Sequence, residues 1–159
     1  MRVIALVDAQ NRGKTTSIKI AKEEFLKDPE VDNPHELTGF YQPVGKDIRA
    51  VVELINGYRI AFCSGGDDSF FVDDNYQYAI CHKCDLLVTA SRGPSKNGSW
   101  TKLTEIMHNT PGNDGLLVKA IDFWPDSPKF LDKDDDYRRI SELTAKHLVN
   151  IIKYAMKRP

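Results

Sequence analysis

The sequence has no apolar run near the roughly 20 residues that a membrane-spanning helix needs. It has only three cysteines in 159 residues, an odd number that does not make the disulfide framework of a small secreted domain. Neither sign of charge is in excess, since 22 Lys and Arg stand against 23 Asp and Glu. This balance gives no global reason to bind nucleic acid or an acidic membrane. We therefore expect a soluble protein with reduced thiols that acts on small molecules.

The amino-terminal segment also lacks the apolar core of a secretory signal peptide. Only five apolar residues follow Arg2 before Asp8 interrupts them, against roughly 7–15 in such a core. We expect a cytoplasmic protein. The length fits a single domain over residues 1–159. It leaves no room for a separate effector domain, so a homo-oligomer or an outside partner is expected.

Alternating apolar and helical patterns predict an α/β domain. Short apolar runs indicate buried strands at 3–7, 86–90 and 116–121. Helical spacing indicates helices at 14–27, 70–83 and 96–108, and a last helix with the apolar stripe Ile140, Leu143, Leu148, Ile151, Ile152 and Ala155. On the first helix, Ile18, Ala21 and Phe25 share one face, with Lys22 largely opposite.

Two further strands, at 48–55 and 58–63, flank Asn56-Gly57, which predicts an antiparallel hairpin with a type I′ turn. The whole order predicts a three-layer sandwich around a mainly parallel sheet with this one hairpin. Residues 28–46 show no sustained period. They form a functional loop or contain a short element that the pattern does not resolve.

The segment between the first strand and the first helix has the composition of a phosphate-binding loop. It reads Asp8-Ala9-Gln10-Asn11-Arg12-Gly13-Lys14-Thr15-Thr16. In such a loop, backbone N–H groups surround the phosphates, a lysine neutralises their charge, and a Ser or Thr hydroxyl holds Mg²⁺. Gly13, Lys14 and Thr15 occupy these positions. The alternative is an ordinary β-α turn with a basic residue at the start of the helix.

This segment resembles the Walker A motif, G-x-x-x-x-G-K-[ST], of the P-loop nucleoside triphosphate hydrolase superfamily, with Asp8 in place of the first glycine. The resemblance covers residues 8–16, and the rest of the chain agrees with the superfamily in its α/β order. It implies a P-loop NTPase-like fold that binds ATP and Mg²⁺. The implied nucleotide contacts come from Gln10, Asn11, Arg12, Gly13, Lys14, Thr15 and Thr16, of which Lys14 bridges the β- and γ-phosphates and Thr15 ligates Mg²⁺.

The superfamily also places an acidic residue after a neighbouring strand, where it orders the water around the metal. Asp67 is our candidate, although Ser64-Gly65-Gly66 separates it from the predicted strand. The alternative is that Asp67 or Asp68 caps the next helix. The Gly65-Gly66 pair would also let backbone N–H groups approach a γ-phosphate.

Arg92 follows the strand predicted at 86–90, and ligands of open α/β sheets bind at the carboxyl ends of strands. We interpret it as a phosphate clamp, with a solvent-facing loop arginine as the alternative. The guanine-reading signature [NT]-K-x-D is absent here, since the segment reads Thr89-Ala90-Ser91-Arg92-Gly93. ATP is therefore the expected nucleotide.

Together these residues predict an ATP- and Mg²⁺-binding protein that hydrolyses ATP or transfers its γ-phosphate to an unidentified small acceptor. A transferase needs an acceptor-binding region, which residues 28–46 could supply. The alternative is a non-catalytic, degenerate P-loop module, which Asp8 favours. Cys81 and Cys84 have the C-x₂-C spacing of half a zinc site, but burial as small apolar side chains is the favoured interpretation for both.

Overall fold

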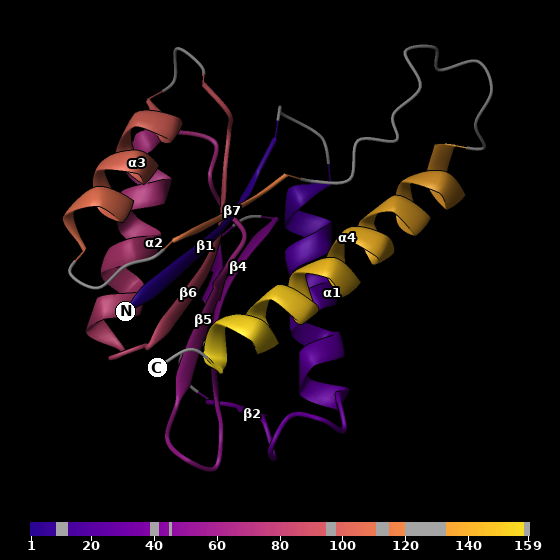
Figure 1. Ribbon diagram of the computed structural model, residues 1–159. Coiled ribbons are helices and arrows are strands. Elements are labelled where there is room, and N and C mark those ends of the chain that lie inside the picture. The colour runs from indigo at the N-terminus through magenta and orange to yellow at the C-terminus, as the bar shows by residue number, and fades with distance from the viewer. Residues whose placement is uncertain are drawn as a thin grey trace.

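The computed structural model describes residues 1–8, 13–38, 42–44, 46–94, 98–110, 115–119 and 133–157. Within these residues, the four strands β2 to β5 follow one another between α1 and α2, and strands and helices alternate in the rest of the order (Figure 1). The strands are β1 (Arg2–Val7), β2 (His35–Glu36), β3 (Gln42–Val44), β4 (Asp47–Glu53), β5 (Arg59–Cys63), β6 (Leu86–Ser91) and β7 (Leu116–Lys119). The helices are α1 (Lys14–Lys27), α2 (Ser69–Cys81), α3 (Ser99–Asn109) and α4 (Lys133–Met156).

All the described strands belong to one mixed sheet. Its order is β2-β4-β5-β6-β1-β7, and β3 also pairs with β4. Strands β5, β6, β1 and β7 are parallel, whereas β4 runs antiparallel to β5, β2 and β3. The predicted hairpin is confirmed. The sheet is mixed rather than mainly parallel because residues 28–46 contribute two short strands, and both pair antiparallel with β4.

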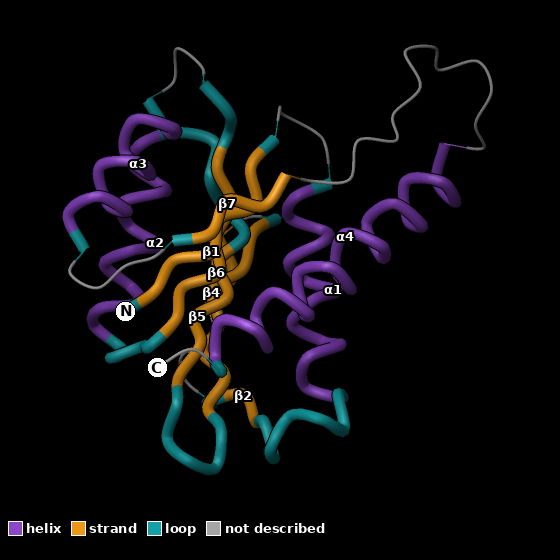
Figure 2. The backbone as a smooth tube through the Cα atoms, viewed as in Figure 1, coloured by secondary structure: helices purple, strands orange, loops and turns teal. Residues whose placement is uncertain are grey.

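Helices cover both faces of the sheet, which confirms the three layers (Figure 2). On one face, α1 and α4 pack on a core that includes Phe25, Phe62, Leu148 and Ile152. On the other face, α2 and α3 bury side chains such as Val72 and Leu103 against the sheet. No helix among the described residues is long and apolar enough to cross a membrane.

Helix α1 has the predicted bounds, and its predicted face is buried: Ile18, Ala21 and Phe25 are all fully covered. Lys22, expected on the opposite face, is buried as well. It can be buried because its ammonium forms ion pairs with Glu36 of β2 and with Glu23. A charged group is tolerated in such a place only when it is paired.

The stripe predicted for α4 is wrong at Leu143, which is 52% exposed. The buried side of α4 continues through smaller residues instead, since Ser141, Thr144 and Ala145 are all covered at helical spacing with Leu148. This side packs against α1. The polar character of Ser141 and Thr144 hides this part of the buried face from a hydrophobicity pattern.

The hairpin turn also differs from the predicted type I′ turn. Gly57 has a φ of 80°, but Asn56 is not among the described residues with positive φ. The amide of Gly57 donates to the carbonyl of Leu54 at 2.9 Å, and the amide of Leu54 donates to the carbonyl of Tyr58 at 2.9 Å. The loop is therefore a turn followed by one left-handed glycine, a common three-residue hairpin connection.

Candidate functional site

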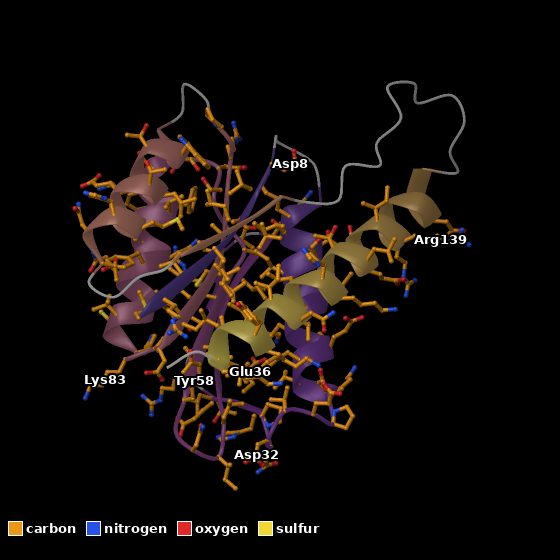
Figure 3. The ribbon with its side chains drawn as sticks, viewed as in Figure 1. Asp8, Asp32, Glu36, Tyr58, Lys83 and Arg139 are labelled. Atoms are coloured by element: carbon orange, nitrogen blue, oxygen red, sulfur yellow. The ribbon has the colours of Figure 1, made fainter. Side chains whose placement is uncertain are left out.

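The topology predicts a ligand-binding edge at the carboxyl ends of two neighbouring strands. Strand β1 leads to α1 on one face of the sheet, and its neighbour β6 leads to α3 on the other face (Figure 1). Two connections that diverge in this way leave a gap between them, and ligands of open α/β sheets bind at such points. In Figure 3, Asp8 marks this edge of the sheet at the end of β1.

The amino terminus of α1 lies at this edge of the sheet and has the features expected of an anion site. Gly13 precedes the helix with a φ of 75°, in the left-handed region that favours glycine. The first turn contains no acidic side chain, so it has no carboxylate to interact with its backbone N–H groups. Gln10, Asn11 and Arg12, the other predicted loop contacts, lie outside the described residues.

A cavity of about 530 Å³ opens at this helix end. It brings together most of the predicted site residues that the structure describes, with four side chains that were not expected there from the sequence: Lys19, Lys46, Asp47 and Ser64. The residues that line it are Gly13, Lys14, Thr15, Thr16, Lys19, Lys46, Asp47, Ser64, Gly66 and Asp67.

Lys14 is the principal cation of the cavity. Its residue is only 7% exposed, and its Nζ donates to the backbone carbonyl of Asp8 at 3.1 Å. Burial lowers the pKa of the Lys14 ammonium, the carboxylates of Asp67 and Asp8 partly oppose this effect, and Arg92 adds to it. The charged form of Lys14 is thus poorly solvated, and an anion bound in the cavity would stabilise it.

Thr15 forms a polar cluster with Asp47, the first residue of β4. The Thr15 hydroxyl donates to Oδ1 of Asp47 at 2.8 Å, and the Ser64 hydroxyl donates to the same oxygen at 3.0 Å. Pairing of β4 with β5 places Asp47 beside the end of β5, because the amide of Ile48 donates to Oγ of Ser64 at 2.9 Å. The carboxylate in contact with Thr15 is therefore that of Asp47.

Sequence reasoning missed Asp47, although a signal for it exists. Once the hairpin is predicted, its register can be followed away from the turn, and Arg49 pairs with Cys63. Two residues earlier, Asp47 then lies across from Gly65. A polar residue at that point of β4 is a candidate for the same edge as Ser64.

Asp67 lines the cavity, but its carboxylate is engaged with Arg92. The Nε of Arg92 donates to Oδ1 of Asp67 at 3.1 Å, and the Arg92 side chain is only 17% exposed, so Arg92 is not a solvent-facing loop arginine. Asp68, not Asp67, caps α2, since its Oδ1 accepts from the amide of Phe71 at 3.0 Å. The assignment of Asp67 to the metal stays a prediction.

The two cysteines of the C-x₂-C pair differ in exposure. Cys84 is buried, as predicted, and burial raises the pKa of its thiol to about 12. Cys81, at the end of α2, is exposed, so the prediction of burial is wrong for it. Among the described residues no group of three or more His, Cys, Asp and Glu side chains is arranged to hold a metal ion.

Comparisons with protein-family models, with curated proteins and with solved structures find no match to this chain. The interpretation of the site therefore depends on its own geometry.

Proposed function

We propose that this protein has a P-loop NTPase-like fold that binds ATP with Mg²⁺ in the cavity at the start of α1. We propose further that it hydrolyses ATP or transfers the γ-phosphate to a small acceptor. The observation that carries the proposal is the convergence of Lys14, of the Thr15–Asp47 pair and of the amino terminus of α1 on one cavity. Each of these groups would make a different contact with a bound triphosphate or its metal ion.

The phosphate-binding part consists of Lys14 and the start of α1. The backbone N–H groups of the first helical turn and the helix dipole favour an anion at this position. Burial lowers the pKa of Lys14, so the ammonium gains more from a phosphate than a fully hydrated lysine would. Thr16 and Lys19 line the same cavity and add donors along the phosphate chain.

The oxygen donors of the site fit Mg²⁺, which prefers one or two carboxylates together with substrate phosphate oxygens. The Thr15 hydroxyl and the Asp47 carboxylate, already 2.8 Å apart, would hold it, with Asp67 as a second carboxylate in the cavity. When bound, the ion would neutralise charge on the phosphates. Arg92, held by Asp67 at 3.1 Å, is the second cation that we assign to the phosphoryl group.

One observation favours a second candidate, a module that binds the nucleotide without turnover. Asp8 replaces the first glycine of the motif, and its carboxylate is close enough to Lys14 to affect the pKa of the ammonium. A carboxylate beside the phosphates opposes the binding of a further negative charge. Measurement of phosphate release with and without added acceptors separates hydrolysis, transfer and binding alone.

Calorimetric titration with Mg-ATP tests the proposal. Lys14→Ala should weaken binding by more than tenfold, at least about 1.4 kcal/mol, because a poorly hydrated charge-assisted contact to phosphate is lost. Lys27→Ala is the matched control, since Lys27 is an exposed lysine at the other end of α1 and its removal should not change the affinity. Equal affinity of Lys14→Ala and wild type, or no binding by wild type, would contradict the proposal.

A competition titration tests the choice of base. Because the guanine-reading aspartate is absent after Ala90, ATP should bind at least as tightly as GTP. A tenfold preference for GTP, roughly 1.4 kcal/mol, would overturn this assignment.

A further inference from the structure

The Ser64-Gly65-Gly66 turn, which joins β5 to Asp67, accepts hydrogen bonds from two buried side chains. Asn75 of α2 donates from Nδ2 to the carbonyl of Gly65 at 2.6 Å. Ser99, the first residue of α3, donates from Oγ to the carbonyl of Gly66 at 2.8 Å. Two successive carbonyls of the turn are therefore drawn towards the helices on the α2 and α3 face of the sheet.

These two bonds fix the direction of the next two amides. In a trans peptide the C=O of one residue and the N–H of the next point in opposite directions in one plane, and no cis peptide occurs among the described residues. The N–H groups of Gly66 and Asp67 are thus directed away from Asn75 and Ser99. Both residues line the cavity, and neither amide has a hydrogen-bond partner among the described residues.

Ser99 joins three parts of the site through one hydroxyl. Besides its bond to Gly66, its Oγ accepts from the amide of Arg92 at 3.1 Å and lies 2.7 Å from Oγ of Ser91. Ser91 and Ser99 are both fully buried. The Arg92 amide also donates to the Gly66 carbonyl at 3.3 Å. The Ser99 hydroxyl therefore holds the turn together with the backbone of Arg92, whose side chain pairs with Asp67.

Asn75 is locked in turn by its neighbours. Its Oδ1 accepts from Nε of Arg49 at 2.9 Å, its Nδ2 also lies 3.2 Å from Oγ1 of Thr89, and Arg49 is paired with Asp74. Asn75 is only 1% exposed. A side chain with its oxygen and nitrogen both engaged in this way has a single orientation, so the carbonyl of Gly65 has one direction.

We propose that Ser99 and Asn75 are positioning residues that direct the Gly66 and Asp67 amides at the terminal phosphate of the bound nucleotide. This inference rests on the proposed function and adds to it a means of distinguishing a triphosphate from a diphosphate. The start of α1 and Lys14 bind phosphates of either ligand, while the turn, contributed by a separate segment, contacts only the outermost phosphate of the longer chain. Two adjacent amides that point the same way form a typical anion-binding arrangement.

Calorimetric titrations with ADP and with the non-hydrolysable analogue AMP-PNP, both with Mg²⁺, test this inference. Ser99→Ala should weaken AMP-PNP binding by roughly fivefold or more, the value expected for misdirected hydrogen bonds to a charged group, and leave ADP affinity within about twofold. The matched control is Thr110→Val, which removes another buried hydroxyl that donates to a backbone carbonyl, that of Ile106, at the far end of α3. It should change neither affinity.

The outcomes separate this inference from the proposed function. If wild type binds both ligands with equal affinity, or if Ser99→Ala weakens both equally, the positioning role is wrong while nucleotide binding stands. If wild type binds neither ligand, both proposals fail.

A second measurement needs no variant, in case Ser99→Ala does not fold. In NMR spectra of the wild-type protein, the Gly66 and Asp67 amide protons should shift downfield with Mg-AMP-PNP and much less with Mg-ADP. Equal shifts with the two ligands would overturn the inference.

Discussion

Polar side chains at the two ends of the parallel strands have different surroundings. At the amino end of β5 and β6, Arg59 donates to Glu53 at 2.7 Å and to the carbonyl of His82 at 3.2 Å, and Asp85 accepts from the amide of Arg59 at 2.9 Å. In Figure 3 the labelled Tyr58 and Lys83 mark this end, and Asp8 marks the other. At the carboxyl end, Lys14 and the Thr15–Asp47 pair surround a cavity instead.

This difference separates polar groups that pair with one another within the fold from polar groups that line a cavity. A buried charge destabilises the fold unless it is paired. At the amino end, the ion pair of Arg59 with Glu53 offsets this destabilisation. At the carboxyl end the destabilisation remains in part, since burial lowers the pKa of Lys14 although Asp67 and Asp8 oppose this. Changes at the carboxyl end should therefore alter binding more than stability, except where the backbone itself is packed.

The largest expected effect is on the packed backbone of the carboxyl end. A Cβ on Gly66 would lie 2.0 Å from the carbonyl oxygen of Ala90, whereas a Cβ on Gly65 would meet only the Asp47 side chain at 3.4 Å. Gly66→Ala must displace backbone and should lower the free energy of unfolding by about 3 kcal/mol or more, against about 1 kcal/mol for Gly65→Ala. Urea denaturation measures both. Equal losses would show that the turn is not packed against β6.

The next effect concerns the charge of Asp47. Asp47→Asn keeps an oxygen that can accept from Thr15 and Ser64, but it removes the negative charge. The gain in ATP affinity on adding Mg²⁺ should fall by roughly thirtyfold, about 2 kcal/mol, because a metal ligand loses its charge. Calorimetry with and without Mg²⁺ measures this gain.

Asp73→Asn is the matched control for Asp47→Asn, because Asp73 is half exposed and lies near Lys102 of α3, outside the cavity lining. The control should leave the gain from Mg²⁺ unchanged. An unchanged gain in Asp47→Asn would remove Asp47 from the metal site and favour Asp67.

The sequence allows the start of α1, the hairpin, and the position of Gly13, Lys14 and Thr15 between β1 and the first turn of α1 to be predicted. Each of these features depends on residues close together in the chain. Asp47 and Asn75 are different. Asp47 reaches Thr15 only through the pairing of β4 with β5, and Asn75 reaches Gly65 only after α2 packs on the sheet. A local pattern does not indicate the contact of Asn75, and it indicates that of Asp47 only if the register of the hairpin is followed beyond the predicted strand. The exposed Leu143 fails for the same reason, since the packing against α1 decides which side of α4 is buried.

A smaller effect is expected at the amino end. Arg59→Ala removes a partly buried pair with Glu53 and a bond to the carbonyl of His82, and should lower the free energy of unfolding by about 1–2 kcal/mol. Arg138→Ala is the control, since its pair with Glu142 on α4 is exposed and such pairs contribute about 0–0.5 kcal/mol. Neither variant should change ATP affinity. A loss of affinity in Arg59→Ala would contradict the division between the two ends.

The smallest effect is the stability of Lys14→Met without ligand. Because burial lowers the pKa of Lys14 in the folded protein, its charged form opposes folding, and the variant should be more stable at pH 7. The gain should be under about 1 kcal/mol, since the bond from Lys14 to the Asp8 carbonyl is lost as well.

Between the lowered folded pKa and the ordinary value of 10.5, the unfolded chain holds more protons at this lysine, so the stability of wild type relative to the variant rises with pH. Burial acts to lower the pKa of Lys22, but its carboxylate partners outweigh this and raise it, and the carboxylate partners of Lys153 raise the pKa of that lysine. Both lysines titrate in wild type and variant alike, so they cancel in the difference. Denaturation of both proteins at pH 7 and pH 10 should therefore show the variant's advantage shrinking at the higher pH, and an advantage that grew would mean that the Lys14 ammonium is already stabilised without a bound anion.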